Sequence, residues 1–97
     1  MRLMMTIKIP VEHGNRAIQD GSMAKAFASL FEAVKPEATY FSMLDGYRAA
    51  FIVYELDEQY KLLDLHEPLF AAMGALIDER PVLNWNDMER AFAELKI

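Results

Sequence analysis

The sequence predicts one α+β domain with a four-stranded antiparallel sheet, in the ferredoxin-like order βαββαβ followed by an extra C-terminal helix. An alternating apolar segment begins the chain, later segments repeat apolar residues at helical spacing, and an Asp-Gly pair joins two segments rich in aromatic and β-branched residues. The chain has 97 residues, of which 54% are hydrophobic, and this is enough for one compact core. We therefore expect a single ferredoxin-like domain over residues 1–97.

The beginning of the chain predicts a strand followed by a helix. Hydrophobicity alternates between positions 3 and 11, so one face of the strand is apolar and carries Leu3, Met5, Ile7, Ile9 and Val11. A turn is expected at His13-Gly14-Asn15. The amphipathic segment after it begins at Ser22, a suitable N-cap. This helix should end at Lys35, because Pro36 disfavours the helical conformation in the residue before it.

Residues 38–44 and 47–56 predict a β-hairpin. The Asp45-Gly46 pair between them is typical of a two-residue turn, in which both residues have positive φ. Such a turn fixes the register, so that Tyr40 lies opposite Phe51 and Leu44 lies opposite Tyr47. Large apolar side chains then occupy both faces of the hairpin.

The second half of the chain predicts a helix, a strand and a final helix. Asp57 is expected to cap the first of these helices, whose apolar stripe comprises Leu62, Leu65, Leu69 and Met73. Gly74 should end it, and residues 76–83 predict the fourth strand. Asn86 and Glu89 have the spacing of a capping box for the last helix, whose inner side would carry Trp85, Met88, Phe92 and Leu95.

Composition excludes several classes of function. Ten Lys and Arg against fifteen Asp and Glu give a net charge of −5, which argues against nucleic acid as a partner. The chain has no cysteine, so thiolate chemistry and disulfides are excluded. The two histidines, His13 and His66, lack metal-ligand spacing, and we predict no metal and no cofactor. No signal peptide or membrane span is recognised, and we expect a cytoplasmic protein.

The apolar hairpin also predicts a homodimer. Right-handed connections place the two main helices on one face of the sheet, and the other face stays open. A large exposed apolar surface marks an interface, so we expect two copies to pair through the open sheet face. The alternative is that the terminal helix folds over that face.

Three segments carry a resemblance to known proteins. They are VEHGNRAIQDG at residues 11–21, KPEATYF at 35–41 and EPLF at 67–70. With the order of elements, they resemble an uncharacterised bacterial ferredoxin-like family and, more broadly, the dimeric α/β-barrel superfamily. That superfamily includes cofactor-free monooxygenases, small isomerases, haem-degrading enzymes and stress-induced proteins. The resemblance therefore implies a dimeric α/β-barrel type of fold and does not select one reaction.

Titratable residues at strand ends form the first candidate site. In this topology we expect the first and third strands to run parallel at the centre of the sheet, so their carboxyl ends bring Asn15 and Arg16 towards Tyr54 and Glu55, with His13, Glu12 and Asp57 nearby. General acid or base chemistry, or ligand binding, is then possible. The alternative is a set of solvated loop residues. Gly14-Asn15-Arg16 could also bind an anion, although a turn requiring positive φ explains Gly14 equally well.

Two further positions are candidates. His66 shares a helical stripe with Leu62 and Leu69, so its ring is expected at the contact between helix and sheet, as a structural residue or as a base. Tyr40 and Phe51 could line a cavity between sheet and helices, or could simply be core residues.

Two functions remain open from sequence. The first is a small soluble dimeric binding or assembly protein with a pocket for a small organic molecule. The alternative is a cofactor-free monooxygenase- or isomerase-like enzyme. In it, His13 or His66 would act as base, and Arg16 or Asn15 would stabilise an enolate-like oxyanion.

Overall fold

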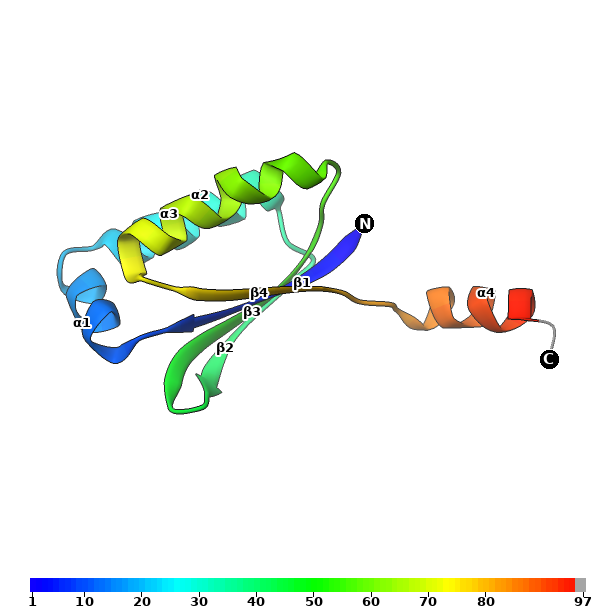
Figure 1. The fold of residues 1–97 in the computed structure, drawn as a ribbon, viewed down its shortest axis with the longest axis horizontal. Coiled ribbons are helices and arrows are strands. Elements are labelled where there is room, and N and C mark those ends of the chain that lie inside the picture. Colours follow the sequence, from blue (N-terminus) through cyan, green and yellow to red (C-terminus); the bar gives the residue numbers. More distant parts are fainter. Residues whose placement is uncertain (96–97) are drawn as a thin grey trace.

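The structure is a computed structural model that describes residues 1–95 (Figure 1). Its elements follow in the order β1 (Arg2–Ile9), α1 (Val11–Gln19), α2 (Ser22–Val34), β2 (Ala38–Leu44), β3 (Tyr47–Glu55), the 3₁₀ helix η1 (Gln59–Lys61), α3 (Leu62–Met73), β4 (Leu76–Pro81) and α4 (Trp85–Leu95).

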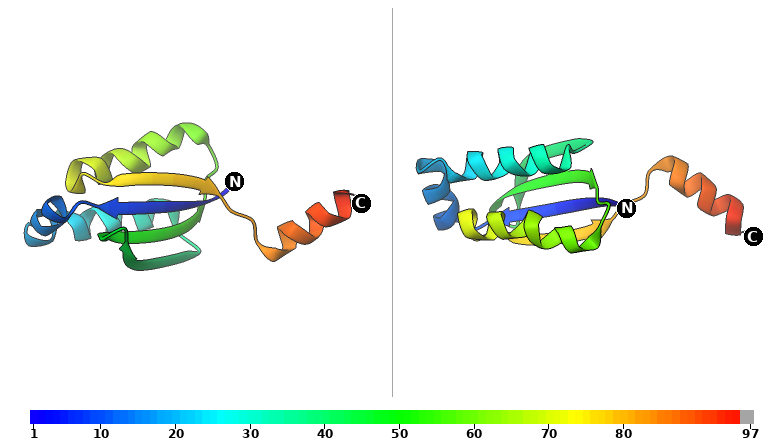
Figure 2. Two further views of the ribbon diagram at one scale, coloured as in Figure 1. Left: turned by 60° about the horizontal axis from the view of Figure 1, so that its bottom comes forward. Right: turned by 90° about the horizontal axis from the view of Figure 1, so that it is seen from above.

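The four strands form one open sheet in the order β2-β3-β1-β4, and every neighbouring pair is antiparallel. Helices α2 and α3 lie side by side on one face of this sheet (Figures 1 and 2). The predicted α+β fold with a C-terminal helix is confirmed, and it is consistent with the ferredoxin-like arrangement. One topological expectation is wrong: β1 and β3 are antiparallel neighbours, so their carboxyl ends lie at opposite ends of the sheet.

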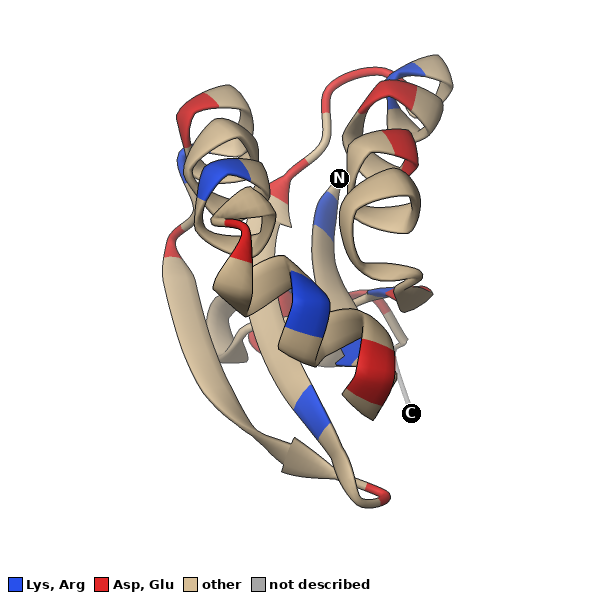
Figure 3. Cartoon of the chain, turned by 90° about the vertical axis from the view of Figure 1, so that its left-hand side faces the viewer, with Lys and Arg blue, Asp and Glu red and all other residues tan. Residues whose placement is uncertain are grey.

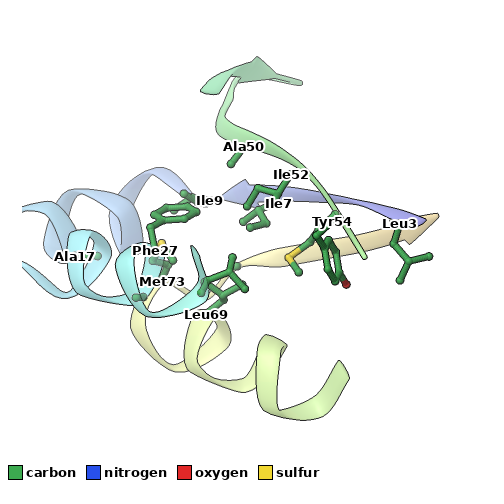
Figure 4. Packing of buried hydrophobic residues seen from close by; sticks show 14 of the residues in the cluster. Leu3, Ile7, Ile9, Ala17, Phe27, Ala50, Ile52, Tyr54, Leu69 and Met73 are labelled. Carbon is green, nitrogen blue, oxygen red and sulfur yellow. The ribbon is translucent and has the colours of Figure 1, made fainter. Parts of the chain in front are cut away.

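The core lies between the sheet and helices α2 and α3 (Figure 4). Alternate residues of β1 face this layer as predicted, and Met5 and Ile7 are completely buried. They pack with Ile52 of β3 and with Leu69 and Met73 of α3. Each such side chain stabilises the fold by about 1.5–3 kcal/mol through removal of apolar surface from water. The sheet is therefore held against the helices chiefly by aliphatic packing.

The β2–β3 hairpin has the predicted register, with Tyr40 opposite Phe51 and Leu44 opposite Tyr47. Asp45 and Gly46 have φ values of 54° and 80°, which is the left-handed conformation at both central turn positions. Aspartate and glycine tolerate this conformation better than most residues do. Turn chemistry and strand pattern thus agree, and the register follows from both.

The region after β1 differs from the expected turn. β1 ends at Ile9, and α1 runs from Val11 to Gln19, so Val11 is not in the strand and His13-Gly14-Asn15 is helical. Pro10, with its fixed φ, is the N-cap and its carbonyl accepts the Gly14 N–H at 2.8 Å. Gly14 does not have positive φ, so the conformational reason expected for a glycine here does not apply.

Several helix ends also differ from the sequence-based expectations. The backbone N–H of Ser22 donates to the Asp20 carboxylate at 2.8 Å, and Gly21 rather than Ser22 is the N-cap of α2. Asp57 binds the Glu58 N–H and the Lys61 ammonium and does not cap α3. Gly74 ends α3 in the left-handed conformation, as predicted.

Helix α4 lies away from the rest of the domain (Figures 1 and 2). The radius of gyration is 15.5 Å, whereas a compact chain of this length has one of ~12–13 Å. The capping box is formed by Asn84 and Asp87, whose side chains each accept the other's backbone N–H, and not by Asn86 and Glu89. Trp85 and Phe92 are 67% and 53% exposed, so α4 does not fold over the open sheet face.

Within the part of the chain that the structure describes, the longest helix has 13 residues, and none has both the length and the apolar character required to cross a bilayer.

Candidate functional site

The antiparallel pairing of β1 and β3 separates the two halves of the predicted strand-end cluster. Ile9 lies opposite Arg48 and Arg2 lies opposite Glu55, so the ends of β1 define two distant sites. The eight residues of β1 span about 26 Å at the usual rise per strand residue. Asn15 and Arg16 lie near one end, and Tyr54 and Glu55 lie near the other. The joint acid–base site expected from sequence is therefore not formed.

At the β3 end, the carboxylates form surface ion pairs. Glu55 lies 2.6 Å from the N-terminal ammonium, and Asp57 lies 2.9 Å from the Lys61 ammonium. The hydrogen bond from Lys61 is the main reason that the pKa of Asp57 is lowered. Tyr54 and Glu55 do line a cavity of about 520 Å³ between α2 and α3, together with Tyr60 and Lys61. The exposed pairs themselves contribute little to stability.

At the other end, Asn15 contacts a residue that sequence analysis did not single out. Arg48, the second residue of β3, donates from Nη2 to Asn15 Oδ1 at 2.9 Å and makes a longer contact of 3.5 Å from Nη1 to the Val11 carbonyl. A Cβ atom on Gly14 would lie 2.6 Å from Arg48 Nη1. The missing side chain of Gly14 thus makes room for the guanidinium against α1, which is why glycine suits this helical position.

Arg16 does not join this contact. It is exposed in the last turn of α1, and its side chain is absent from the hydrogen bonds and ion pairs found among residues 1–95. Figure 3 views the molecule from this end, where α1 carries one acidic and one basic position, Glu12 and Arg16. The prediction of an anion site before the first helix is wrong. Gly14-Asn15-Arg16 lies inside α1 and does not form a loop that precedes the helix.

A groove of about 490 Å³ lies next to Arg48, between α1, α2 and the hairpin. Nine residues line it and only Ser42 and Arg48 among them are polar. On its apolar side, the rings of Phe27 and Phe41 meet edge to face with centroids 5.4 Å apart. Phe41 is 61% exposed and Ile18 is 53% exposed, so large apolar side chains face solvent here. We call this feature the Arg48 groove.

Tyr40 and Phe51 are cross-strand partners, as predicted, but they do not line a cavity between sheet and helices. Phe51 pairs with Thr6, on the face of β1 opposite to Met5 and Ile7. Tyr40 is 69% exposed. Both side chains therefore lie on the open face of the sheet. Successive residues of a strand point to opposite faces, and helices α2 and α3 cover the face opposite to these two side chains.

His66 lies at the contact between α3 and the sheet, as predicted. Its Nε2 atom is 3.0 Å from Glu79 Oε1, and the Tyr54 hydroxyl is 2.8 Å from the same oxygen. Burial, and secondarily the Glu79 carboxylate, raises the pKa of the Tyr54 phenol well above its ordinary value. A cavity of about 370 Å³ beside Glu79 is lined also by Leu3, Leu56 and Leu62. The sequence pattern placed His66 correctly, but it gave no signal for its carboxylate partner.

The His13 ring, which projects from α1, lies against Gly74 at the C-terminal end of α3. A Cβ atom on Gly74 would lie 2.8 Å from His13 Nδ1. Neither His13 nor His66 lines the Arg48 groove or the cavity beside Glu79. Within residues 1–95, no three His, Asp or Glu side chains are close enough together to hold a metal ion.

The open sheet face carries apolar side chains from three strands, with Thr6 beside them, and we call these apolar residues the open-face patch. It crosses three strands through the pairs Met4–Val53 and Tyr40–Phe51, and Ala38 lies opposite Val53. Ion pairs surround it at both strand ends and along β4, namely Arg2–Glu37 at 2.7 Å, Lys8–Asp45 at 3.3 Å and Arg80–Asp78 at 2.7 Å. An apolar centre with a charged rim is typical of a protein–protein interface.

These features define an α+β protein with one unpartnered sheet face and an apolar groove on its helix-covered side. No known family model matches the chain, and comparison with curated proteins finds no match.

Proposed function

We propose that the protein is a homodimeric binding or assembly protein, in which two copies pair through the open-face patch and a pocket on the helix-covered side holds a small organic molecule. One observation carries the proposal: Met4, Val53, Phe51 and Tyr40 form an apolar surface on the face that α2 and α3 leave open. A single copy would leave Tyr40 exposed and the other three side chains only half-buried. Pairing with a second copy buries these side chains. Each Å² of apolar surface removed from water contributes about 25 cal/mol of favourable free energy.

The distribution of charge supports pairing of identical surfaces. The charged residues around the patch are already joined in pairs of opposite sign within one copy, such as Arg80 with Asp78. Two such surfaces therefore meet without a large excess of like charge. In a twofold dimer the same patch serves both copies, which satisfies the requirement of a closed assembly.

Helix α4 supplies a second unpartnered apolar surface. Trp85, Phe92 and Leu95 are all more than half exposed. An isolated helix of 11 residues is only marginally stable in water. The helix is attached to the domain through the ion pair between Arg2 and Asp87 at 2.9 Å. The proposed dimer gives α4 a surface to pack on, because the partner brings further apolar area to the end of the sheet.

Sedimentation across a concentration series tests the dimer. We expect the wild-type chain to sediment as a dimer at micromolar concentration, and Phe51→Lys to sediment as a folded monomer, because the lysine places a charge at the centre of the patch. Leu63→Lys is the matched control, since Leu63 is 69% exposed on α3 and lies outside the patch. A monomeric wild-type chain, or a Phe51→Lys chain that dimerises normally, would contradict the proposal.

An enzyme that uses a histidine base is the second candidate, favoured by the His66–Glu79 contact at 3.0 Å. A carboxylate that accepts from one ring nitrogen orients an imidazole and increases its basicity at the other. The side chains of His66 and Glu79 are 17% and 14% exposed, so the contact is largely buried but remains partly accessible to solvent. This candidate requires substrate to reach the ring of His66. Any turnover by the wild-type chain should then be lost in His66→Gln and retained in His13→Gln.

A further inference from the structure

We propose that the Arg48 groove binds a small monocarboxylic acid with an apolar body, whose carboxylate pairs with the Arg48 guanidinium. The inference rests on the proposed function only in assuming that a small organic molecule is bound. It does not require the dimer, because the groove lies on the helix side of the hairpin and the open-face patch lies on the other.

The guanidinium at the groove has hydrogen-bonding capacity left over. Arginine has five N–H donors, and the contacts to Asn15 and Val11 engage two nitrogen atoms through one hydrogen each. Both acceptors are uncharged, and Arg48 is absent from the ion pairs found among residues 1–95. A guanidinium with neutral partners beside an apolar surface favours a carboxylate, which it binds through two parallel hydrogen bonds.

The position of the guanidinium is fixed before any ligand arrives. Asn15 holds Nη2 at 2.9 Å, and the absence of a side chain at Gly14 lets α1 approach Nη1 closely. A long side chain that is already restrained loses less conformational entropy on binding. Asn15 and Gly14 therefore act as positioning residues for Arg48.

The remaining walls select an apolar body. Phe27 and Phe41 form an edge-to-face pair at 5.4 Å, and Met23 and Ile18 complete the apolar surface. The volume of about 490 Å³ lies within the range of small-molecule sites, ~300–1,000 Å³. Exposed Phe41 and Ile18 leave water when a hydrocarbon chain occupies the groove, and this favours an alkyl or aryl-alkyl group.

The charge of the site indicates a monoanion. Arg48 is the only basic residue among those that line the groove, and the whole chain has a net charge of −5. A dianion such as a phosphate monoester would place a second negative charge beside apolar walls without a cation to balance it. A monocarboxylate is balanced by one guanidinium.

Calorimetric titration with octanoate tests the site, with octan-1-ol as the neutral probe of similar size. We expect octanoate to bind wild-type protein with a Kd on the order of 0.1–1 mM. Octan-1-ol should bind at least about tenfold more weakly, because it cannot form the charged pair. Equal affinity for both probes, or no heat with octanoate at millimolar concentration, would overturn the inference.

Two variants separate the guanidinium from the apolar walls. Arg48→Met keeps an apolar stem and should lose about 10- to 100-fold in octanoate affinity. Gly14→Ala keeps the guanidinium but displaces it, and alanine favours the helix, so the fold should persist while affinity falls. Arg16→Met, which removes an exposed charge from the same helix, should bind as wild type does. Unchanged affinity in both Arg48→Met and Gly14→Ala would overturn the inference.

Sedimentation of the same samples separates this inference from the dimer. Octanoate binding by a monomeric wild-type chain would contradict only the dimer, and a dimer that ignores octanoate would contradict only the carboxylate site.

Discussion

Tyr54 of β3 and Glu79 of β4 meet across the central strand β1, where the phenol oxygen lies 2.8 and 2.9 Å from the two carboxylate oxygens. Tyr54 is 1% exposed, and His66 of α3 approaches the same carboxylate from above the sheet. Side chains of β3, α3 and β4, which follow one another along the chain, are therefore joined at one largely buried carboxylate. This contact links α3 to both strands that flank β1.

Removal of the Tyr54 hydroxyl should destabilise the fold measurably. Tyr54→Phe keeps the ring but removes a hydrogen bond to a carboxylate, and the free energy of unfolding should fall by about 1–3 kcal/mol. Urea unfolding followed by circular dichroism measures this change. Tyr60→Phe is the control, since Tyr60 is 71% exposed, and it should be nearly neutral. Equal effects of the two changes would show that the Tyr54–Glu79 contact is not stabilising.

The stability of the fold should decrease in alkaline solution. Burial and the Glu79 carboxylate raise the pKa of Tyr54 above the value of about 10 for an unfolded tyrosine. The contribution of Tyr54 is thus fully present below pH ~10 and decreases above it, because the unfolded chain loses the phenol proton while the folded chain retains it. Urea midpoints at a series of pH values from ~8 upward should show this decline. Tyr54→Phe should show a smaller one.

Core packing between α3 and the sheet should dominate stability. Leu69 is completely buried, and Leu69→Ala should cost about 2–5 kcal/mol through lost burial and a residual cavity. Leu63→Ala, on the exposed side of the same helix, should change the free energy of unfolding by less than about 0.5 kcal/mol. Thermal and urea unfolding give both values. A large effect at Leu63 would indicate that α3 is covered on its outer side as well.

Helix α4 should be protected only when two copies pair. In Phe51→Lys, which we expect to be monomeric, the backbone amides of residues 85–95 should exchange rapidly with solvent, because an isolated helix of this length is marginal. In the wild-type dimer we expect slower exchange over the same residues. Hydrogen exchange measured by mass spectrometry resolves this segment. Identical exchange rates in the two proteins would show that α4 is not part of the dimer interface.

Local patterns predicted the strands and the hairpin because their causes are local. Alternation along β1 needs only the two-residue period of a strand, and Asp45-Gly46 needs only residues that tolerate positive φ. Helix α1 could not be predicted in the same way. The local pattern at Gly14 predicts a turn, whereas Gly14 lies in a helix beside Arg48, a residue 34 positions away.

The candidate sites depended on strand direction, which local patterns do not specify. An incorrect parallel assignment of β1 and β3 brought Asn15 and Tyr54 together, and the antiparallel pairing places them at opposite ends of the sheet. His66 was placed correctly because a helical stripe identifies its side of α3. Its partner Glu79 lies on β4, and no spacing within the sequence connects the two.

Local sequence patterns are sufficient for the strands, the hairpin register and the apolar character of both hairpin faces, since these follow from side-chain period and turn conformation between near neighbours. Three features depend on packing in three dimensions: Arg48 lies against α1 beside a groove, Tyr54 and His66 share Glu79, and α4 lies apart from the sheet (Figure 1). The first two are contacts between side chains of different elements, and their geometry arises only when helices and strands pack around one core.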